Sequence, residues 1–145
     1  MRQNFKELAA TAVVNYKDKN FCTVAALAMT LDWSFGKAHR HMAKHGRKNK
    51  RGMFERDWAP AIAEAAIKAG KRFEPYRGFW IAGVHGAETN NMTLKRFCRE
   101  HPTGTYYVKV SGHAVAIVDG VMHDWTADTA GRRKIIGAYK LVDGE

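Results

Sequence analysis

The chain has 145 residues, of which 46% are hydrophobic and 11% are aromatic, and its formal net charge at pH 7 is +10. This composition excludes a disordered chain, and the length predicts one domain, residues 1–145, with a hydrophobic core. No apolar run reaches the roughly 20 residues of a membrane span, and two cysteines do not make a disulfide framework. We therefore expect a cytoplasmic protein with no membrane partner.

The first two predicted helices flank a polar loop. Residues 3–14 have the pattern of a short amphipathic helix, in a start that shows no signal-peptide cleavage site. Residues 15–21, "NYKDKNF", are predicted to form the loop. Residues 22–32, "CTVAALAMTLD", are rich in Ala, Leu and Met, so we expect a buried helix that begins at or just before Cys22.

Two more helices and a basic loop follow in the first half of the chain. Residues 34–46 are predicted to be helical, with Ser34 as the N-cap and a glycine just past the end. The sequence "RKNKRG", residues 47–52, then predicts a basic loop. Residues 57–70 are the next predicted helix, with Asp57 as its cap.

The second half is predicted to consist mainly of antiparallel strands. A short helix capped by Thr93 is expected to end before Pro102. The segments expected to be extended are residues 72–81, 105–110, 113–118, 121–125 and 134–142. Helices in the first half and strands in the second predict an α+β fold.

The stretch "GHAVAIVDGVMHDW", residues 112–125, predicts a hairpin that brings a carboxylate beside a histidine. Its central Asp-Gly dipeptide favours a two-residue turn, because both turn positions need φ > 0. In that register Val118 pairs with Val121, so His113 and Asp124 are diagonal neighbours on one face. Their Cβ atoms are then expected within roughly 7–8 Å of each other.

Cys22 is the candidate nucleophile that such a pair would serve. At the start of a buried helix, the positive end of the helix dipole favours a thiolate, and the unpaired amides favour an oxyanion. A thiolate nucleophile needs an imidazole to hold its proton, and the imidazole needs a third group to orient it. Cys22, His113 and Asp124 supply these roles in chain order. The alternative is that the cysteine and the histidine are ordinary packed residues.

Three blocks of sequence carry a resemblance to a known family: "NFCTVAALAM", "HGRKNKRGM" and "MTLKRFCREHPTGTYYVKVSGHAVAIVDGVMHDW". In this order they resemble the papain-like cysteine peptidases, and more closely the small C39-peptidase-like proteins encoded by tailed bacteriophages. The resemblance implies a papain-like fold, in which N-terminal helices, one with the nucleophile at its N-terminus, pack on a C-terminal antiparallel sheet. It matches Cys22 to the nucleophile, His113 to the base and Asp124 to the orienting residue.

The predicted oxyanion hole departs from the family pattern. Six residues before the cysteine, where many members carry a glutamine, this chain has Tyr16, and Phe21 replaces a frequent aspartate. Asn15 and Asn20 are the candidate donors of the missing hydrogen bond, and nothing in the sequence selects between them.

Much of the positive charge is local, in residues 37–52 and 68–77. Basic clusters bind acidic proteins or nucleic acid, although a merely solvated basic face is the alternative. The residues of the candidate basic binding surface are Arg47, Lys48, Lys50 and Arg51. Aromatic residues are not interleaved with this run as a stacking platform for bases requires.

Together these features predict a cysteine-dependent acyl-transfer enzyme, a peptidase or amide hydrolase, that acts on a protein or peptide substrate without a cofactor. The resemblance implies a phage-encoded enzyme that acts on a host or phage protein inside an infected bacterial cell. The alternative is an inactive papain-like domain whose basic face binds nucleic acid or inhibits a host nucleic-acid-associated factor. His41 and His45 have the helical spacing of metal ligands, but no carboxylate or cysteine completes the set, so we expect no metal.

Overall fold

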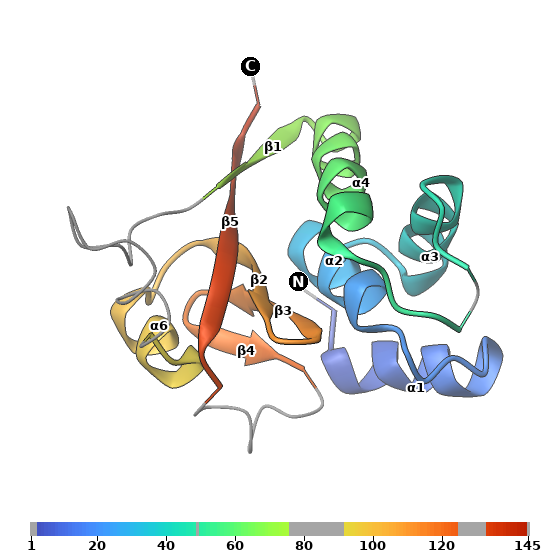
Figure 1. Ribbon diagram of the computed structural model, residues 1–145, viewed down its shortest axis with the longest axis horizontal. Coiled ribbons are helices and arrows are strands. Elements are labelled where there is room, and N and C mark those ends of the chain that lie inside the picture. Colours follow the sequence, from blue (N-terminus) through green and yellow to red (C-terminus); the bar gives the residue numbers. More distant parts are fainter. Residues whose placement is uncertain (1–2, 49, 76–91, 125–132, 145) are drawn as a thin grey trace.

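The computed structural model of the chain describes residues 3–48, 50–75, 92–124 and 133–144 (Figure 1). The helices are α1 (Phe5–Asn15), α2 (Cys22–Leu31), α3 (Phe35–Lys44), α4 (Glu55–Lys68) and α6 (Leu94–Glu100). The strands are β1 (Lys71–Pro75), β2 (Thr105–Val110), β3 (His113–Val118), β4 (Val121–His123) and β5 (Ile135–Asp143). They form a five-stranded antiparallel sheet in the order β1-β5-β2-β3-β4. The fold is α+β, as the sequence predicts.

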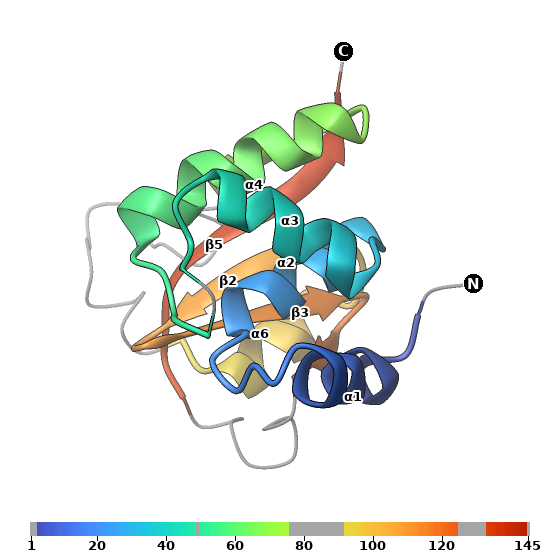
Figure 2. The same cartoon turned by 90° about the vertical axis from the view of Figure 1, so that its right-hand side faces the viewer.

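The sheet separates two hydrophobic cores. Helices α1 to α4 lie on one side of the sheet and α6 lies on the other (Figures 1 and 2). On the first side, Tyr107 and Ala114 of the sheet pack with the helices, and on the second side Val108 and Val115 pack with Phe97 of α6. Neighbouring residues of one strand therefore serve different cores, because side chains alternate between the faces of a strand.

Helix α2 lies at the centre of the first core. Its residues Thr23 to Thr30 are all buried, and the helix packs against β3 and α3. A helix that is apolar on all its faces is stable only when other elements surround it, which explains the run of Ala, Leu and Met in its sequence. The predicted buried helix that begins at Cys22 is confirmed.

Two of the predicted helix caps are confirmed and one is wrong. The side chains of Ser34 and Thr93 accept hydrogen bonds from first-turn amides of α3 and α6. Helix α4, however, begins at Glu55, so Asp57 lies within its first turn and does not cap it. An acidic residue at either position interacts favourably with the positive end of the helix, so composition alone does not distinguish the two starts.

Each predicted strand corresponds to a described one, although β1 begins and β5 ends one residue beyond the predicted range. The extended segment predicted at 72–81 corresponds to β1, which ends at Pro75, and its remainder lies outside the described residues. The hairpin strand predicted at 121–125 corresponds to β4, and its last residue, Trp125, also lies outside them. No helix in the described ranges combines the length and the apolar character that crossing a membrane requires.

A buried ion pair joins the loop before α2 to the segment after α3. The Arg47 guanidinium donates a hydrogen bond to the Asp18 carboxylate, and the two side chains are 1% and 0% exposed. The same guanidinium also donates to the backbone carbonyl of Asn20. Arg47 was predicted to belong to an exposed basic surface, and this prediction is wrong, because Asp18 holds its charge inside the protein.

We expect Arg47→Met to lower the free energy of unfolding by about 3–5 kcal/mol, because it leaves the Asp18 carboxylate buried without a counter-charge. Urea denaturation followed by circular dichroism measures the change. Lys48→Met is the matched control: this side chain is exposed, so we expect an effect within about 0.5 kcal/mol. Equal stabilities of the two variants would contradict a structural role for the pair.

Candidate active site

Cys22 is the first residue of helix α2 and is half-buried. The first-turn amides of a helix have no intrahelical partner, and together with the helix dipole they place positive potential at this end. The cysteine sulfur therefore lies where a negative charge, on the sulfur itself or on a nearby oxygen, is stabilised.

A hydrogen bond to strand β2 fixes the start of this helix. The Tyr107 hydroxyl donates to the backbone carbonyl of Thr23 over 3.1 Å, and both residues are buried. The Tyr107 ring also packs against Trp58 of α4, with ring centroids 4.9 Å apart. Burial raises the pKa of the Tyr107 hydroxyl well above its ordinary value, so the group stays protonated and keeps donating.

His113 is the first residue of β3 and Asp124 directly follows β4. The register is the predicted one: Val118 pairs with Val121, at a turn whose two central residues both have positive φ. The His113 Nε2 atom lies 3.0 Å from each carboxylate oxygen of Asp124. The two side chains are only 9% and 2% exposed, so this pair is largely shielded from water.

Cys22 lies next to the His113 ring: both residues line the same pocket, and the cysteine raises the pKa of the ring. Because Nε2 faces the Asp124 carboxylate, the other ring nitrogen, Nδ1, is the one left for the sulfur. The structure thus brings together the three residues that the sequence singled out, in the order sulfur, imidazole and carboxylate. Burial alone would lower the pKa of His113, but the hydrogen bonds with Asp124, its charge and the neighbouring Cys22 raise it to about 9.

A pocket of about 540 Å³ opens beside Cys22 and His113. Its apolar wall includes Met53, Phe54 and Trp58, which come from α4 and from the segment before it. Phe54 is 72% exposed, so an aromatic ring stands at the rim of the pocket and remains largely in solvent. A pocket of this composition accommodates an apolar group next to the cysteine.

The pocket also contains a charged pair that sequence reasoning missed. Lys109 of β2 donates to one carboxylate oxygen of Glu55 over 2.8 Å, and the Tyr139 hydroxyl donates to the other over 2.8 Å. Burial raises the pKa of Glu55, but these hydrogen bonds and the Lys109 charge lower it below its usual value. The three residues are far apart in the chain and have no characteristic spacing, so the sequence offers no signal that would group them.

The two candidate oxyanion residues do not lie at this pocket. Asn15 is the exposed last residue of α1, and Asn20 donates its side-chain amide to the backbone carbonyl of Lys50 over 2.9 Å. Neither is among the described residues that line the pocket, and Tyr16 packs against Phe35 and His39. Within the described ranges, the first-turn amides of α2 are the donors best placed for an oxyanion.

No group of three or more potential metal-binding side chains occurs in the described ranges. His41 and His45, at metal-ligand spacing on α3, have other contacts. The ring of His41 contacts the backbone carbonyl of Ala61, and His45 forms an ion pair with Glu64 when it is protonated.

Comparisons of the chain with protein-family models, with curated proteins and with solved structures give no match.

We expect the His113 imidazolium to titrate at about pH 9 in an NMR titration of its ring protons. In Asp124→Asn the carboxylate charge is lost, so the pKa should fall toward its ordinary value of 6.5. Asp119→Asn is the control, since Asp119 lies at the turn of the same hairpin and contacts Gly104 instead of the ring.

The same pKa has a consequence for stability. A folded-state pKa of about 9, above the ordinary 6.5, means that the charged ring stabilises the fold fully below pH 6.5. This contribution is lost as the pH rises through 9. A His113 pKa near 6.5 in the wild-type protein, unchanged in Asp124→Asn, would contradict the charge coupling.

Proposed function

We propose that this protein is a cysteine-dependent acyl-transfer enzyme, a peptidase or amide hydrolase, with a papain-like arrangement of its active site. One observation carries the proposal: a cysteine at a helix N-terminus and a histidine that contacts a shielded carboxylate line the same pocket, which can hold a substrate group. Each element alone is common in protein structures, whereas the three in line have the geometry of an activated nucleophile.

The proposed reaction has two stages. The Cys22 sulfur, as a thiolate, attacks the carbonyl carbon of an amide and forms a carbon–sulfur bond. The oxyanion that develops faces the first-turn amides of α2. The His113 imidazolium then gives its proton to the leaving nitrogen, the carbon–nitrogen bond breaks, and an acyl-enzyme and an amine result.

In the second stage His113 takes a proton from a water molecule, whose oxygen attacks the thioester carbon. The carbon–sulfur bond breaks, the acid product leaves, and the thiolate and imidazolium are restored. Asp124 does not change its protonation state; it holds the ring in the tautomer and orientation that both stages need and stabilises its positive charge.

A second candidate is an inactive papain-like domain that acts as a basic binding protein. It is favoured by the position of Asn15 and Asn20, because no side-chain amide is among the described residues that line the pocket. The two candidates differ in what they require of Cys22: the enzyme needs a reactive sulfur at low pH, and the binding protein does not.

We expect iodoacetamide to alkylate Cys22 at a rate that falls less than about threefold between pH 8 and pH 6. A free thiol with a pKa of about 8.5 loses roughly 80-fold over this interval. Peptide mass spectrometry separates this rate from that of Cys98, an internal control on α6. Burial raises the pKa of the Cys98 thiol, so its alkylation should be slow and should fall steeply with pH.

His113→Ala should remove the low-pH reactivity of Cys22, because the imidazolium no longer balances the thiolate charge. His39→Ala is a change of the same type on α3. It should leave the profile unaltered, because the His39 ring packs against Tyr16 and Phe35 and does not line the pocket. If Cys22 of the wild-type protein has the pH profile of a free thiol, the proposal of an enzyme is rejected and the binding protein remains as the candidate function.

A further inference from the structure

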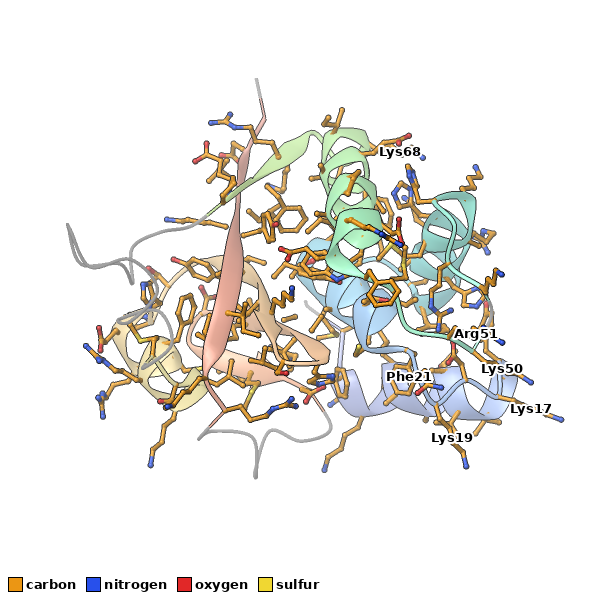
Figure 3. All side chains as sticks on the ribbon, viewed as in Figure 1. Lys17, Lys19, Phe21, Lys50, Arg51 and Lys68 are labelled. Carbon is orange, nitrogen blue, oxygen red and sulfur yellow. The ribbon has the colours of Figure 1, made fainter. Side chains whose placement is uncertain are left out.

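Two loops of the molecule present a group of exposed cations, which we call the basic platform. The first loop lies between α1 and α2, and the second lies between α3 and α4. The residues of the platform are Lys17, Lys19, Lys48, Lys50 and Arg51, all of them exposed. The labelled members lie together along one edge of the molecule, whereas Lys68 lies at the far end of α4 (Figure 3).

The two loops are tied to each other. The side-chain amide of Asn20 donates to the backbone carbonyl of Lys50 over 2.9 Å, and the buried Arg47 contacts both Asp18 and the Asn20 carbonyl. Since Asp18 and Arg47 point into the protein, the lysines on either side of them point outward. The two loops therefore present their cations on one surface and are not two independent basic tails.

No carboxylate of the two loops neutralises the exposed cations of the platform. The acidic residue of the two loops is Asp18, and its charge is used by Arg47. Among the ion pairs between described residues, none includes a member of the platform. Exposed like charges that are held close together without counter-charges attract an anionic partner.

The platform leads directly into the active-site pocket. Lys19 lies three residues before Cys22, so their Cα atoms are at most about 11 Å apart. Arg51 is followed by Gly52 and Met53, which line the pocket. A chain that lies across the platform therefore reaches the cysteine within a few residues.

Two polyanions fit such a surface, an acidic peptide and a nucleic acid. Binding of single-stranded nucleic acid relies on exposed aromatic rings on which the bases stack. In the first loop Phe21 is buried and Tyr16 packs against Phe35, and in the second loop the exposed Phe54 ring lines the active-site pocket. A single exposed ring does not form the series of rings on which successive bases stack. The neighbouring sulfur and imidazole, moreover, are groups that act on a protein.

We propose that the basic platform binds an acidic segment of the protein substrate and thereby delivers the adjoining residues to Cys22. The proposal rests on the function proposed above and adds the class of substrate. Aspartate and glutamate side chains would face the lysines, and an apolar residue would enter the pocket beside Phe54 and Trp58.

The test uses the full chain with Cys22→Ala, so that binding is measured without chemistry. The probe is a fluorescein-labelled twelve-residue peptide of alternating Glu and Gly, and its matched control carries Gln in place of Glu. Fluorescence anisotropy gives the dissociation constants. We expect binding of the Glu peptide that weakens with rising salt, and at least about tenfold weaker binding of the Gln peptide.

Charge reversal locates the binding surface. Lys17→Glu combined with Lys50→Glu should weaken binding of the Glu peptide at least about tenfold. Lys95→Glu combined with Arg99→Glu, the same charge change on α6 across the sheet, should have an effect below about twofold. Lys17→Gln with Lys50→Gln repeats the test with a milder change, and thermal denaturation verifies that each variant is folded.

Equal weakening by the two charge-reversed variants, or equal binding of the Glu and Gln peptides, would overturn the proposal. Tighter binding of a single-stranded RNA dodecamer, lost with the same lysines, would overturn it in favour of nucleic acid. In the wild-type protein the bound Glu peptide should slow alkylation of Cys22 by a bulky maleimide, and unchanged alkylation would also overturn it. An unreactive Cys22, by contrast, would reject the enzyme and leave the binding result intact.

Discussion

The buried ion pair between Asp18 and Arg47 constrains the loop that leads into α2 and Cys22. Two charges removed from water are costly, and they are stable there only when each satisfies the other. Together with the contact between Arg47 and the Asn20 carbonyl, the pair ties this loop to the segment after α3. It also turns the flanking lysines outward. One buried contact thus helps to hold together the two loops that carry the basic platform beside Cys22.

The proposed chemistry of the site depends on electrostatic interactions among side chains that are largely shielded from water. The helix N-terminus presents positive potential to the sulfur, and the Asp124 carboxylate supports positive charge on the His113 ring. Burial opposes that charge, yet the pKa of the ring rises to about 9, so the partners outweigh the loss of hydration. The Tyr107 hydroxyl contributes by position alone, since it fixes the first turn of α2 against β2.

The sequence was most informative where geometry is local. An Asp-Gly dipeptide sets the hairpin register, and the register places His113 beside Asp124 without any knowledge of the remaining fold. It failed where an outcome depends on long-range contacts. Arg47 looks like its exposed neighbours in the sequence, and only the approach of the preceding loop makes it a buried partner of Asp18. Asn20 was a candidate donor to the oxyanion, but its side-chain amide donates to the backbone carbonyl of Lys50 instead. The contact of Glu55 with Lys109 joins α4 to β2, and no sequence spacing between the two residues would predict it.

A crystal structure of the protein after reaction with a peptide chloromethyl ketone would test the proposed active site most directly. We expect a thioether at the Cys22 sulfur, with the ketone oxygen at the first-turn amides of α2 and the His113 ring between the adduct and Asp124. A probe attached to Cys98 instead, an unmodified Cys22, or a ketone oxygen directed away from α2 would contradict it.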